Sequence, residues 1–175
     1  RLWAYEQEVV HTIQDKHENS IFLPGVPLPR TLVATSSMAD AVEECEGVLF
    51  VVPSHVTRPV LQSLASCLPA PVPLISATKG IEAGSLQRMS EIIQNETGHR
   101  HAVVALSGPS FAAEVVACQP TAIVAASEDP VAADAVQEAF SNSTFRVYTH
   151  DDIIGVELGG ALKNVMAVAT GICEG

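Results

Sequence analysis

Two lysines in apolar surroundings are the side chains of this sequence best suited to chemistry. One of them, Lys163, follows a pair of glycines in the stretch ELGGALKNV. On a helical wheel Lys163 shares one face with mostly small residues at spacings of three, four and seven. The residues of that face are Val156, Gly159, Gly160, Ala167 and Thr170. We expect a lysine in this place to be partly desolvated, which lowers its pKa and suits it to proton transfer.

The second lysine, Lys79, directly follows an apolar run in the stretch SATKG. Ligands of a doubly wound sheet bind at the carboxyl ends of its strands, where a lysine can direct its ammonium group at an anionic ligand. For Lys79 the alternative is an ordinary surface lysine. The alternative for Lys163 is a lysine at a domain edge whose ammonium group extends into solvent.

Two more strand ends carry residues that could border a ligand. They read VVPSHV, with Pro53, and LSGPSF, with Gly108, Pro109 and Ser110. Each proline is also a residue that would simply stop a strand. The continuation GPSFAAEVV predicts a tight turn and a helix capped by Ser110, whose free backbone amides favour an anion or a cofactor carboxamide. Alternatively, Ser110 only caps its helix.

The elements that position these residues follow from hydrophobic periodicity. Short apolar runs, each of strand length, occupy residues 1–5, 31–36, 47–53, 72–78, 101–109, 121–127 and 145–150. Segments with helical spacing lie between most of them, as in 54–68, which predicts βαβ units and a largely parallel sheet. Runs such as VLFVV are apolar at successive positions, as expected for strands covered by helices on both faces. Residues 17–31, with three prolines and a glycine, are expected to form a loop.

Composition excludes several classes of protein. A chain of 175 residues with 47% hydrophobic and 17% charged residues is expected to be globular. Its net charge of −11 argues against a nucleic-acid partner. Four scattered cysteines predict neither a zinc site nor a dithiol motif and fit a reducing cytosol. No secretory signal is visible, and Glu157, Lys163 and Asn164 argue against a membrane span over 153–173.

The two ends of the sequence and its glycines suggest a piece of a longer protein. The chain opens on an apparent strand and closes in a helix with no following domain to pack against. No two of the 11 glycines are separated by a single residue, so the sequence contains no GxGxxG phosphate loop. We therefore expect an internal fragment, with any pyrophosphate loop upstream of Arg1.

Taken together and in order, the motifs resemble the NAD(P)-dependent glycerol-3-phosphate dehydrogenases of bacterial type. They are LWAY, HENSIFLPGVPLP, VVPSH, SATKGIE, SGPSFAAEV, PTAIVAAS, FRVYTHDDIIGVELGGALKNV and GICEG. The resemblance covers essentially the whole chain. It implies an α/β fold: a Rossmann-type, doubly wound, mostly parallel sheet over 1–150 that lacks its first strand and Gly-rich loop. The first helix of an all-α substrate domain would follow over 151–175.

The resemblance also implies an activity, a location and a set of site residues. The reaction is the reversible reduction of dihydroxyacetone phosphate to sn-glycerol 3-phosphate for glycerophospholipid synthesis, in the cytoplasm, by an enzyme that could be a homodimer. Lys163 would be the catalytic residue, accepting a proton in oxidation and donating it in reduction. Residues implied to contact substrate are Lys79, Gly108, Ser110, Lys163 and Asn164. Residues implied to contact the cofactor are Tyr5, Pro53, Val56, Lys79 and Ala112. No metal is implied.

Cofactor choice and two competing functions stay open at this point. The second strand of the implied fold runs through Trp3 and Tyr5 into Glu6, which favours neither NAD nor NADP cleanly, so both are expected. A 3-hydroxyacid or 6-phosphogluconate dehydrogenase also pairs a Rossmann domain with a lysine-bearing helix, but such families tend to space the lysine and asparagine further apart than in LKN. A non-catalytic nucleotide-sensing module is expected to lose Lys79 or Lys163, and both are present. The fragment alone is expected to bind cofactor weakly and to be inactive.

Overall fold

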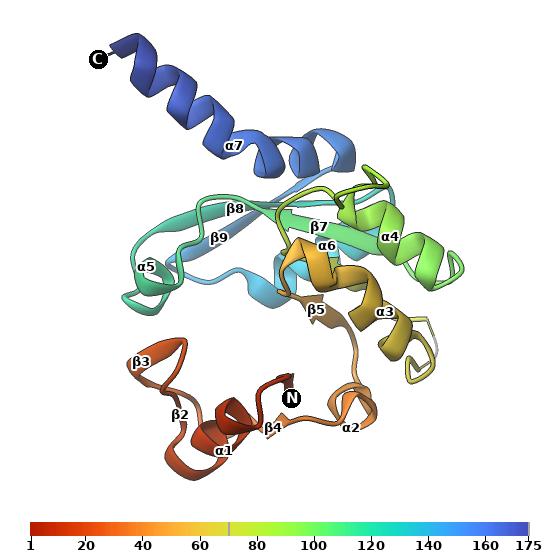
Figure 1. The fold of residues 1–175 in the computed structure, drawn as a ribbon, viewed down its shortest axis with the longest axis vertical. Helices are drawn as coiled ribbons and strands as arrows, with labels where there is room; N and C mark the ends of the chain where they lie inside the picture. Colours follow the sequence, from red (N-terminus) through yellow and green to blue (C-terminus); the bar gives the residue numbers. More distant parts are fainter. Residues whose placement is uncertain (70, 175) are drawn as a thin grey trace.

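The computed structural model of the chain describes residues 1–69 and 71–174, and from residue 34 onward strands alternate with helices (Figure 1). The strands are β1 (Leu2–Trp3), β2 (Glu18–Asn19), β3 (Leu23–Pro27), β4 (Ala34–Thr35), β5 (Val48–Phe50), β6 (Leu74–Ser76), β7 (Val103–Ser107), β8 (Thr121–Ala126) and β9 (Phe145–His150). The helices are α1 (Gln7–Lys16), α2 (Met38–Val42), the 3₁₀ turn η1 (Ser54–Val56), α3 (Thr57–Ala65), α4 (Met89–Glu96), α5 (Ala112–Val116), α6 (Pro130–Phe140) and α7 (Ile153–Glu174). Each of the seven predicted runs contains a strand.

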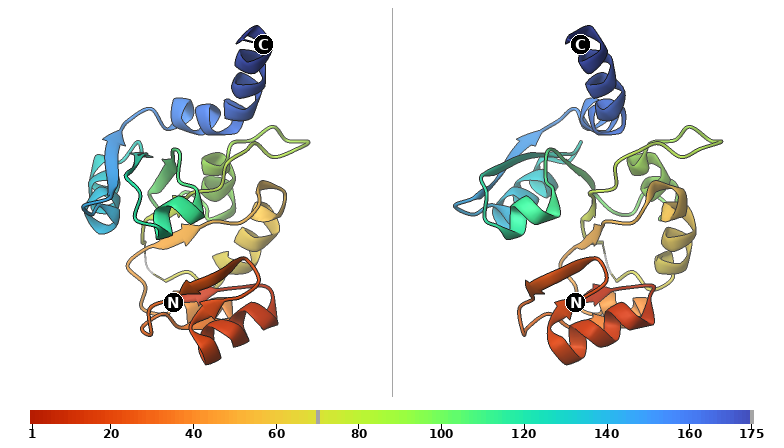
Figure 2. Two further views of the ribbon diagram at one scale, coloured as in Figure 1. Left: turned by 90° about the vertical axis from the view of Figure 1, so that its left-hand side faces the viewer. Right: turned by 60° about the vertical axis from the view of Figure 1, so that its left-hand side comes forward.

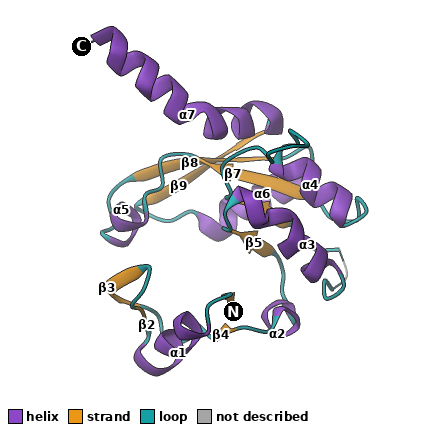
Figure 3. Cartoon of the chain, viewed as in Figure 1, coloured by secondary structure: helices purple, strands orange, loops and turns teal. Residues whose placement is uncertain are grey.

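The largest sheet has the strand order β5-β6-β7-β8-β9. Its neighbours pair in parallel except β7 and β8, which are antiparallel. A separate two-stranded sheet pairs β1 with β4 in parallel. The prediction of a mostly parallel α/β sheet is therefore confirmed, and Figure 3 marks its strands and the helices around them by colour.

The central strands are apolar at successive positions because both faces of the sheet are covered. Leu74 and Val103 pack in one core with residues of α3, α4 and the start of α7. Their chain neighbours Ile75 and Val104 point to the opposite face and pack in a second core with α6. Successive side chains of a strand point to opposite faces, so the runs of buried residues in β6 and β7 follow from this double covering, as predicted.

Residues 17–31 are not the simple loop that their prolines predict. β2 and β3 pair in an antiparallel hairpin, and the backbone amide of Gly25 donates to the Glu18 carboxylate at 3.0 Å. Gly25 has φ +78°, the left-handed conformation that glycine adopts without strain. Proline lacks a ladder donor but is tolerated where a strand has a free edge. In a two-stranded sheet both strands are edges, so Pro24 and Pro27 do not prevent pairing.

The last helix, α7, leaves the body of the molecule after its first turns (Figure 2). Ile153 is its one buried residue among those described, and the Asp152 carboxylate accepts the Gly155 amide at 2.8 Å to start the helix. By length and by a mean hydropathy of 1.3 over its most apolar window, α7 could span a membrane; a core helix of a soluble protein passes the same test. The predicted division into 1–150 and 151–175 stays a prediction.

Candidate active site

An open cavity of about 470 Å³ lies where the carboxyl ends of β6 and β7 meet the first turns of α7. Lys79 contributes from the segment after β6, and the residues from Ser107 to Phe111 contribute from the end of β7 and the following loop. The helix contributes its small face, consisting of Gly155, Val156, Gly159, Gly160 and Lys163. The two lysines singled out in the sequence, 84 residues apart by their numbers, therefore share one cavity.

A hydrogen bond holds the side chain of Lys79 in place within this cavity. Its Nζ donates a hydrogen bond to the carbonyl oxygen of Gly108 at 2.7 Å. Burial lowers the pKa of Lys79 below its ordinary value of 10.5, and the positive charge of Lys163 lowers it further. Lys79 is thus a fixed, partly desolvated cation, and its ammonium group is repelled by that of Lys163.

Gly108 is required by the close approach of β7 and β8. Its φ of +152° is a conformation that side chains disfavour, and a Cβ at this position would lie 2.8 Å from Cγ2 of Ile123. The chain can therefore turn out of β7 and present the Gly108 carbonyl to Lys79 only with glycine here.

Lys163 faces the same cavity but is more exposed than the sequence predicts. Its Nζ lies 5.4 Å from the centroid of the Phe111 ring, within the range of a cation–π contact. Lys163 is an exposed residue, so the prediction that it is partly desolvated is wrong for this chain. The physical reason is that the described residues of α7 beyond Ala161 are exposed, with little protein packed around them.

Ser110 does not cap the helix that follows it, and that prediction is wrong. Helix α5 begins at Ala112 with Phe111 in the N-cap position and no side-chain cap. The amide of Ser110 instead donates to the carbonyl of Gly108 at 3.1 Å, so the turn out of β7 delays the start of the helix. Ser110 still lines the cavity and is exposed.

Of the residues implied to contact the cofactor, Lys79 lines this cavity. The segment of Pro53 and Val56 packs beside its loop: the Thr78 hydroxyl donates to the Val52 carbonyl at 2.8 Å. A Cβ on Gly80 would lie 3.0 Å from Oγ of Ser54.

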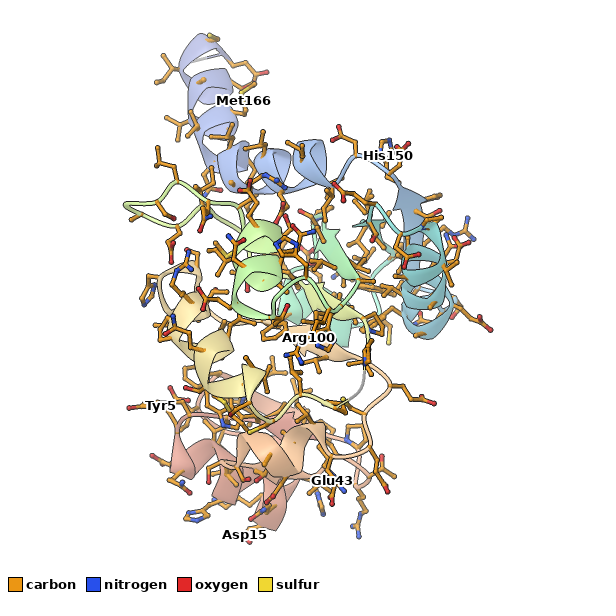
Figure 4. The ribbon with its side chains drawn as sticks, turned by 90° about the vertical axis from the view of Figure 1, so that its right-hand side faces the viewer. Tyr5, Asp15, Glu43, Arg100, His150 and Met166 are labelled. Carbon is orange, nitrogen blue, oxygen red and sulfur yellow. The ribbon has the colours of Figure 1, made fainter. Side chains whose placement is uncertain are left out.

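The other implied contacts lie outside the cavity lining. Tyr5 is 82% exposed and sits among the N-terminal elements, away from Met166 on α7 (Figure 4). Ala112 and Asn164 are exposed neighbours of lining residues. The binding roles of all the implied residues stay predictions.

Sequence patterns missed several residues that shape the site. Ser107 and Phe111 stand inside the motif LSGPSF, where an aromatic ring beside a candidate ligand turn was an available signal. Glu157 contacts Arg88 and Ser90 across 67 or more positions, and no local pattern could indicate this. Among the described residues, no group of three or more His, Cys, Asp or Glu could hold a metal ion.

Comparison with known proteins identifies the family. The family model described as NAD-dependent glycerol-3-phosphate dehydrogenase N-terminus matches residues 1–133, and the C-terminus model of the same family matches 152–175. The chain is 49% identical to glycerol-3-phosphate dehydrogenase (NAD(P)+) of Koribacter versatilis, with 100% of this chain and 52% of that protein aligned. The protein of the same name from Bacillus cereus is 48% identical with the same coverage.

Solved structures agree with the sequence relatives. The glycerol-3-phosphate dehydrogenase of Coxiella burnetii superposes with a TM-score of 0.90 at 36% identity, over 99% of this chain and 53% of that one. That of Saccharomyces cerevisiae gives 0.87 at 29%, over 98% and 53%. A pyrroline-5-carboxylate reductase of Coxiella burnetii, at 15% identity over 79% of this chain and 50% of that one with a TM-score of 0.58, shares the fold alone. The chain spans about half the length of the curated relatives it matches, and it belongs to the NAD-dependent glycerol-3-phosphate dehydrogenase family.

Proposed function

We propose that a protein of the relatives' full length containing this chain, called the full-length protein below, reversibly reduces dihydroxyacetone phosphate to sn-glycerol 3-phosphate with NADH or NADPH. The product would supply glycerophospholipid synthesis. The observation that carries the proposal is the convergence of Lys79 and Lys163 on one cavity at the carboxyl end of the sheet. The names of the relatives, at 48–49% identity, support the substrate and the cofactor pair.

Reduction of a ketone requires a hydride at carbon and a proton at oxygen. A nicotinamide cofactor, when bound, would supply the hydride. Lys163, reaching the cavity from α7, donates the proton to the carbonyl oxygen and accepts it back in the oxidation direction. Lys79 holds a positive charge beside that oxygen, where negative charge develops as the hydride arrives.

Lys79 is suited to electrostatic stabilisation because it cannot move freely. Its hydrogen bond to the Gly108 carbonyl orients the ammonium group before substrate arrives, so little reorganisation is needed in the transition state. Lys163, the more exposed of the two, faces the same cavity from α7. The positive charges also favour a substrate that carries a phosphate.

The described residues fit the nicotinamide end of the cofactor and the substrate. The cavity of about 470 Å³ has room for small ligand groups, and a Cβ on Gly159, which lines it, would meet no atom within 4 Å. Lys79, Gly108 and the neighbouring Pro53–Val56 segment would border the nicotinamide ring. The sequence holds no GxGxxG motif for the pyrophosphate. We therefore propose that the 175-residue chain alone binds NADH weakly and lacks useful activity, which calorimetry would test.

We also propose a cytoplasmic location. All four cysteines are free thiols, which fits a reducing compartment. Fractionation of cells that express the full-length protein would test the location. Formation of a homodimer stays a prediction.

The decisive experiment measures loss of NADH and of NADPH absorbance with dihydroxyacetone phosphate, for the wild-type full-length protein and for Lys163→Met. We expect turnover in the wild type and a collapse of kcat in Lys163→Met. Lys16→Met is the matched control, because Lys16 is an exposed lysine on α1 outside the cavity. Turnover that survives in Lys163→Met would show that Lys163 is not needed for proton transfer. A wild type that binds cofactor but does not turn over would redirect the search to other hydroxyacid substrates.

A further inference from the structure

A carboxylate on α7, that of Glu157, accepts hydrogen bonds from the start of α4. The side chain of Glu157 is 6% exposed and accepts three hydrogen bonds from two residues. The donors are the backbone amide of Ser90 at 2.7 Å, the hydroxyl of Ser90 at 2.6 Å and Nη1 of Arg88 at 2.7 Å. A buried carboxylate with this number of donors is a directional connection between two helices.

The chemistry of the helix start explains why a carboxylate fits here. Ser90 lies in the first turn of α4, where backbone amides have no partner within the helix. The positive end of the helix dipole also favours a negative charge at this place. Arg88, itself 18% exposed and paired in addition with Glu91 at 3.2 Å, balances the charge of Glu157. Glu157, although it lies on α7, thus accepts a hydrogen bond from a first-turn amide of α4 that has no partner within its own helix.

The remaining contacts of α7 constrain its orientation less. Ile153 is buried and Val156 packs partly against the same core, but apolar contacts are not directional. Gly160 adds one tight point, since a Cβ there would lie 2.7 Å from Oγ of Ser107. Among the described residues, the bonds of Glu157 are the polar contacts between α7 and another helix that resist rotation about the axis.

Rotation of α7 matters because Lys163 lies further along it. Lys163 lies six positions after Glu157, which is about 9 Å of rise and about 240° of rotation. With Glu157 bonded to α4, the helix turns Gly160 toward Ser107 and Lys163 toward Phe111. A rotation of about 30° would move side-chain atoms at the helix surface by about 3 Å, and displacements of about 1 Å can cost a factor of about 100 in rate.

We propose that Glu157 is a positioning residue of this site: its bonds to Arg88 and Ser90 hold α7 in the rotation at which Lys163 reaches the cavity beside Lys79. The role rests on the proposed function, since it acts through the proton transfer assigned to Lys163. Glu157 itself is not among the residues that line the cavity.

The test uses Glu157→Gln in the full-length protein, with Glu91→Gln as the matched control. The amide that replaces the Glu157 carboxylate keeps the shape of the side chain but cannot balance the charge of Arg88, whereas Glu91 contacts the same arginine without touching α7. We expect kcat with dihydroxyacetone phosphate to fall by about tenfold or more in Glu157→Gln, with KM for NADH unchanged, and to stay near wild type in Glu91→Gln. In a Lys163→Met background, Glu157→Gln should cause little further loss.

A loss that is equally large in the Lys163→Met background would indicate a general effect on folding and overturn the positioning role. An unchanged kcat in Glu157→Gln would overturn it as well. If Glu157→Gln does not fold, Ser90→Ala removes one donor alone and should lower kcat less but in the same Lys163-dependent way.

A readout independent of turnover separates this role from the proposed function. NMR titration of the Lys79 side chain should give a higher pKa in Glu157→Gln than in the wild type, because a displaced Lys163 repels Lys79 less, and no rise in Glu91→Gln. An unchanged pKa of Lys79 overturns the positioning role whatever the turnover. The wild type could also fail to reduce dihydroxyacetone phosphate while the pKa of Lys79 still rises in Glu157→Gln. That result would support the positioning role and overturn the proposed function alone.

Discussion

The ammonium nitrogen of Lys79 lies 2.7 Å from the carbonyl oxygen of Gly108, so a hydrogen bond joins the ends of two neighbouring strands. β6 and β7 are parallel, and therefore their carboxyl ends lie at the same edge of the sheet. The bond places a cation at that edge and uses one of the three donors of its ammonium group.

Replacing Lys79 by Met should separate function from stability. The folded pKa of Lys79 is below its ordinary value, so folding disfavours the charged form, and at pH below that folded pKa the charge reduces stability. We expect Lys79→Met in the full-length protein to lower kcat/KM by about 100- to 1000-fold while the thermal midpoint at pH 7 stays the same or rises. A midpoint that falls along with activity would show that Lys79 holds the fold together. Lys16→Met serves as the control in both assays.

Gly108→Ala should destabilise the protein through two separate effects. A strained backbone costs about 1–3 kcal/mol, and the added Cβ would also meet Ile123 at 2.8 Å. Gly84→Ala is a useful comparison, because Gly84 has φ +99° but a Cβ there would meet nothing within 4 Å. Urea unfolding should show a larger loss of stability for Gly108→Ala than for Gly84→Ala. Equal losses of stability in the two variants would mean that Ile123 on β8 shifts to accommodate the added Cβ at little cost.

Gly160→Ala should disturb the seating of α7, and a second substitution should correct it. The added Cβ would lie 2.7 Å from Oγ of Ser107 but 3.8 Å from its Cβ. Gly160→Ala should therefore lower kcat, and the double variant with Ser107→Ala should recover much of it in steady-state assays. Gly159→Ala should show no corresponding rescue by Ser107→Ala, because a Cβ at Gly159 meets no atom within 4 Å. Failure of the rescue would place the effect of Gly160 elsewhere.

Glu82 should make the loop after Lys79 sensitive to acid. Hydrogen bonds from Arg58 and Ser85 lower the pKa of Glu82 from 4.5 to about 2. Because the folded pKa is the lower one, the stabilisation is present above about pH 4.5 and is lost as the pH falls toward 2. The wild type should be more stable than Glu82→Gln at pH 7, with the difference shrinking across that range in denaturant titrations. Glu138→Gln, at an exposed position of α6 with no ion pair in the described part of the chain, should show no such convergence. A gap that is independent of pH would contradict the role of the carboxylate.

Local patterns predicted the elements well where one physical cause dominates. Runs that are apolar at successive positions fit strands covered on both faces, as in β6 and β7, and each of these runs contains a strand. The hairpin over 17–31 escaped prediction because its prolines forbid pairing in an interior strand but not at a free edge. Ser110 was mistaken for a cap because the turn forced by Gly108 moves the start of α5 beyond it.

The amino-acid sequence by itself determined the α/β class, the family resemblance and the pair of lysines as the chemical candidates, because periodicity, glycine placement and motif order are local properties of the chain. The tertiary structure alone decided how those lysines meet. The bond of Lys79 to Gly108, the exposure of Lys163 and the contact of Glu157 with Ser90 each depend on where distant segments pack. Burial and electrostatic coupling are properties of the surroundings of a residue in space, and a residue's neighbours along the chain do not specify those surroundings.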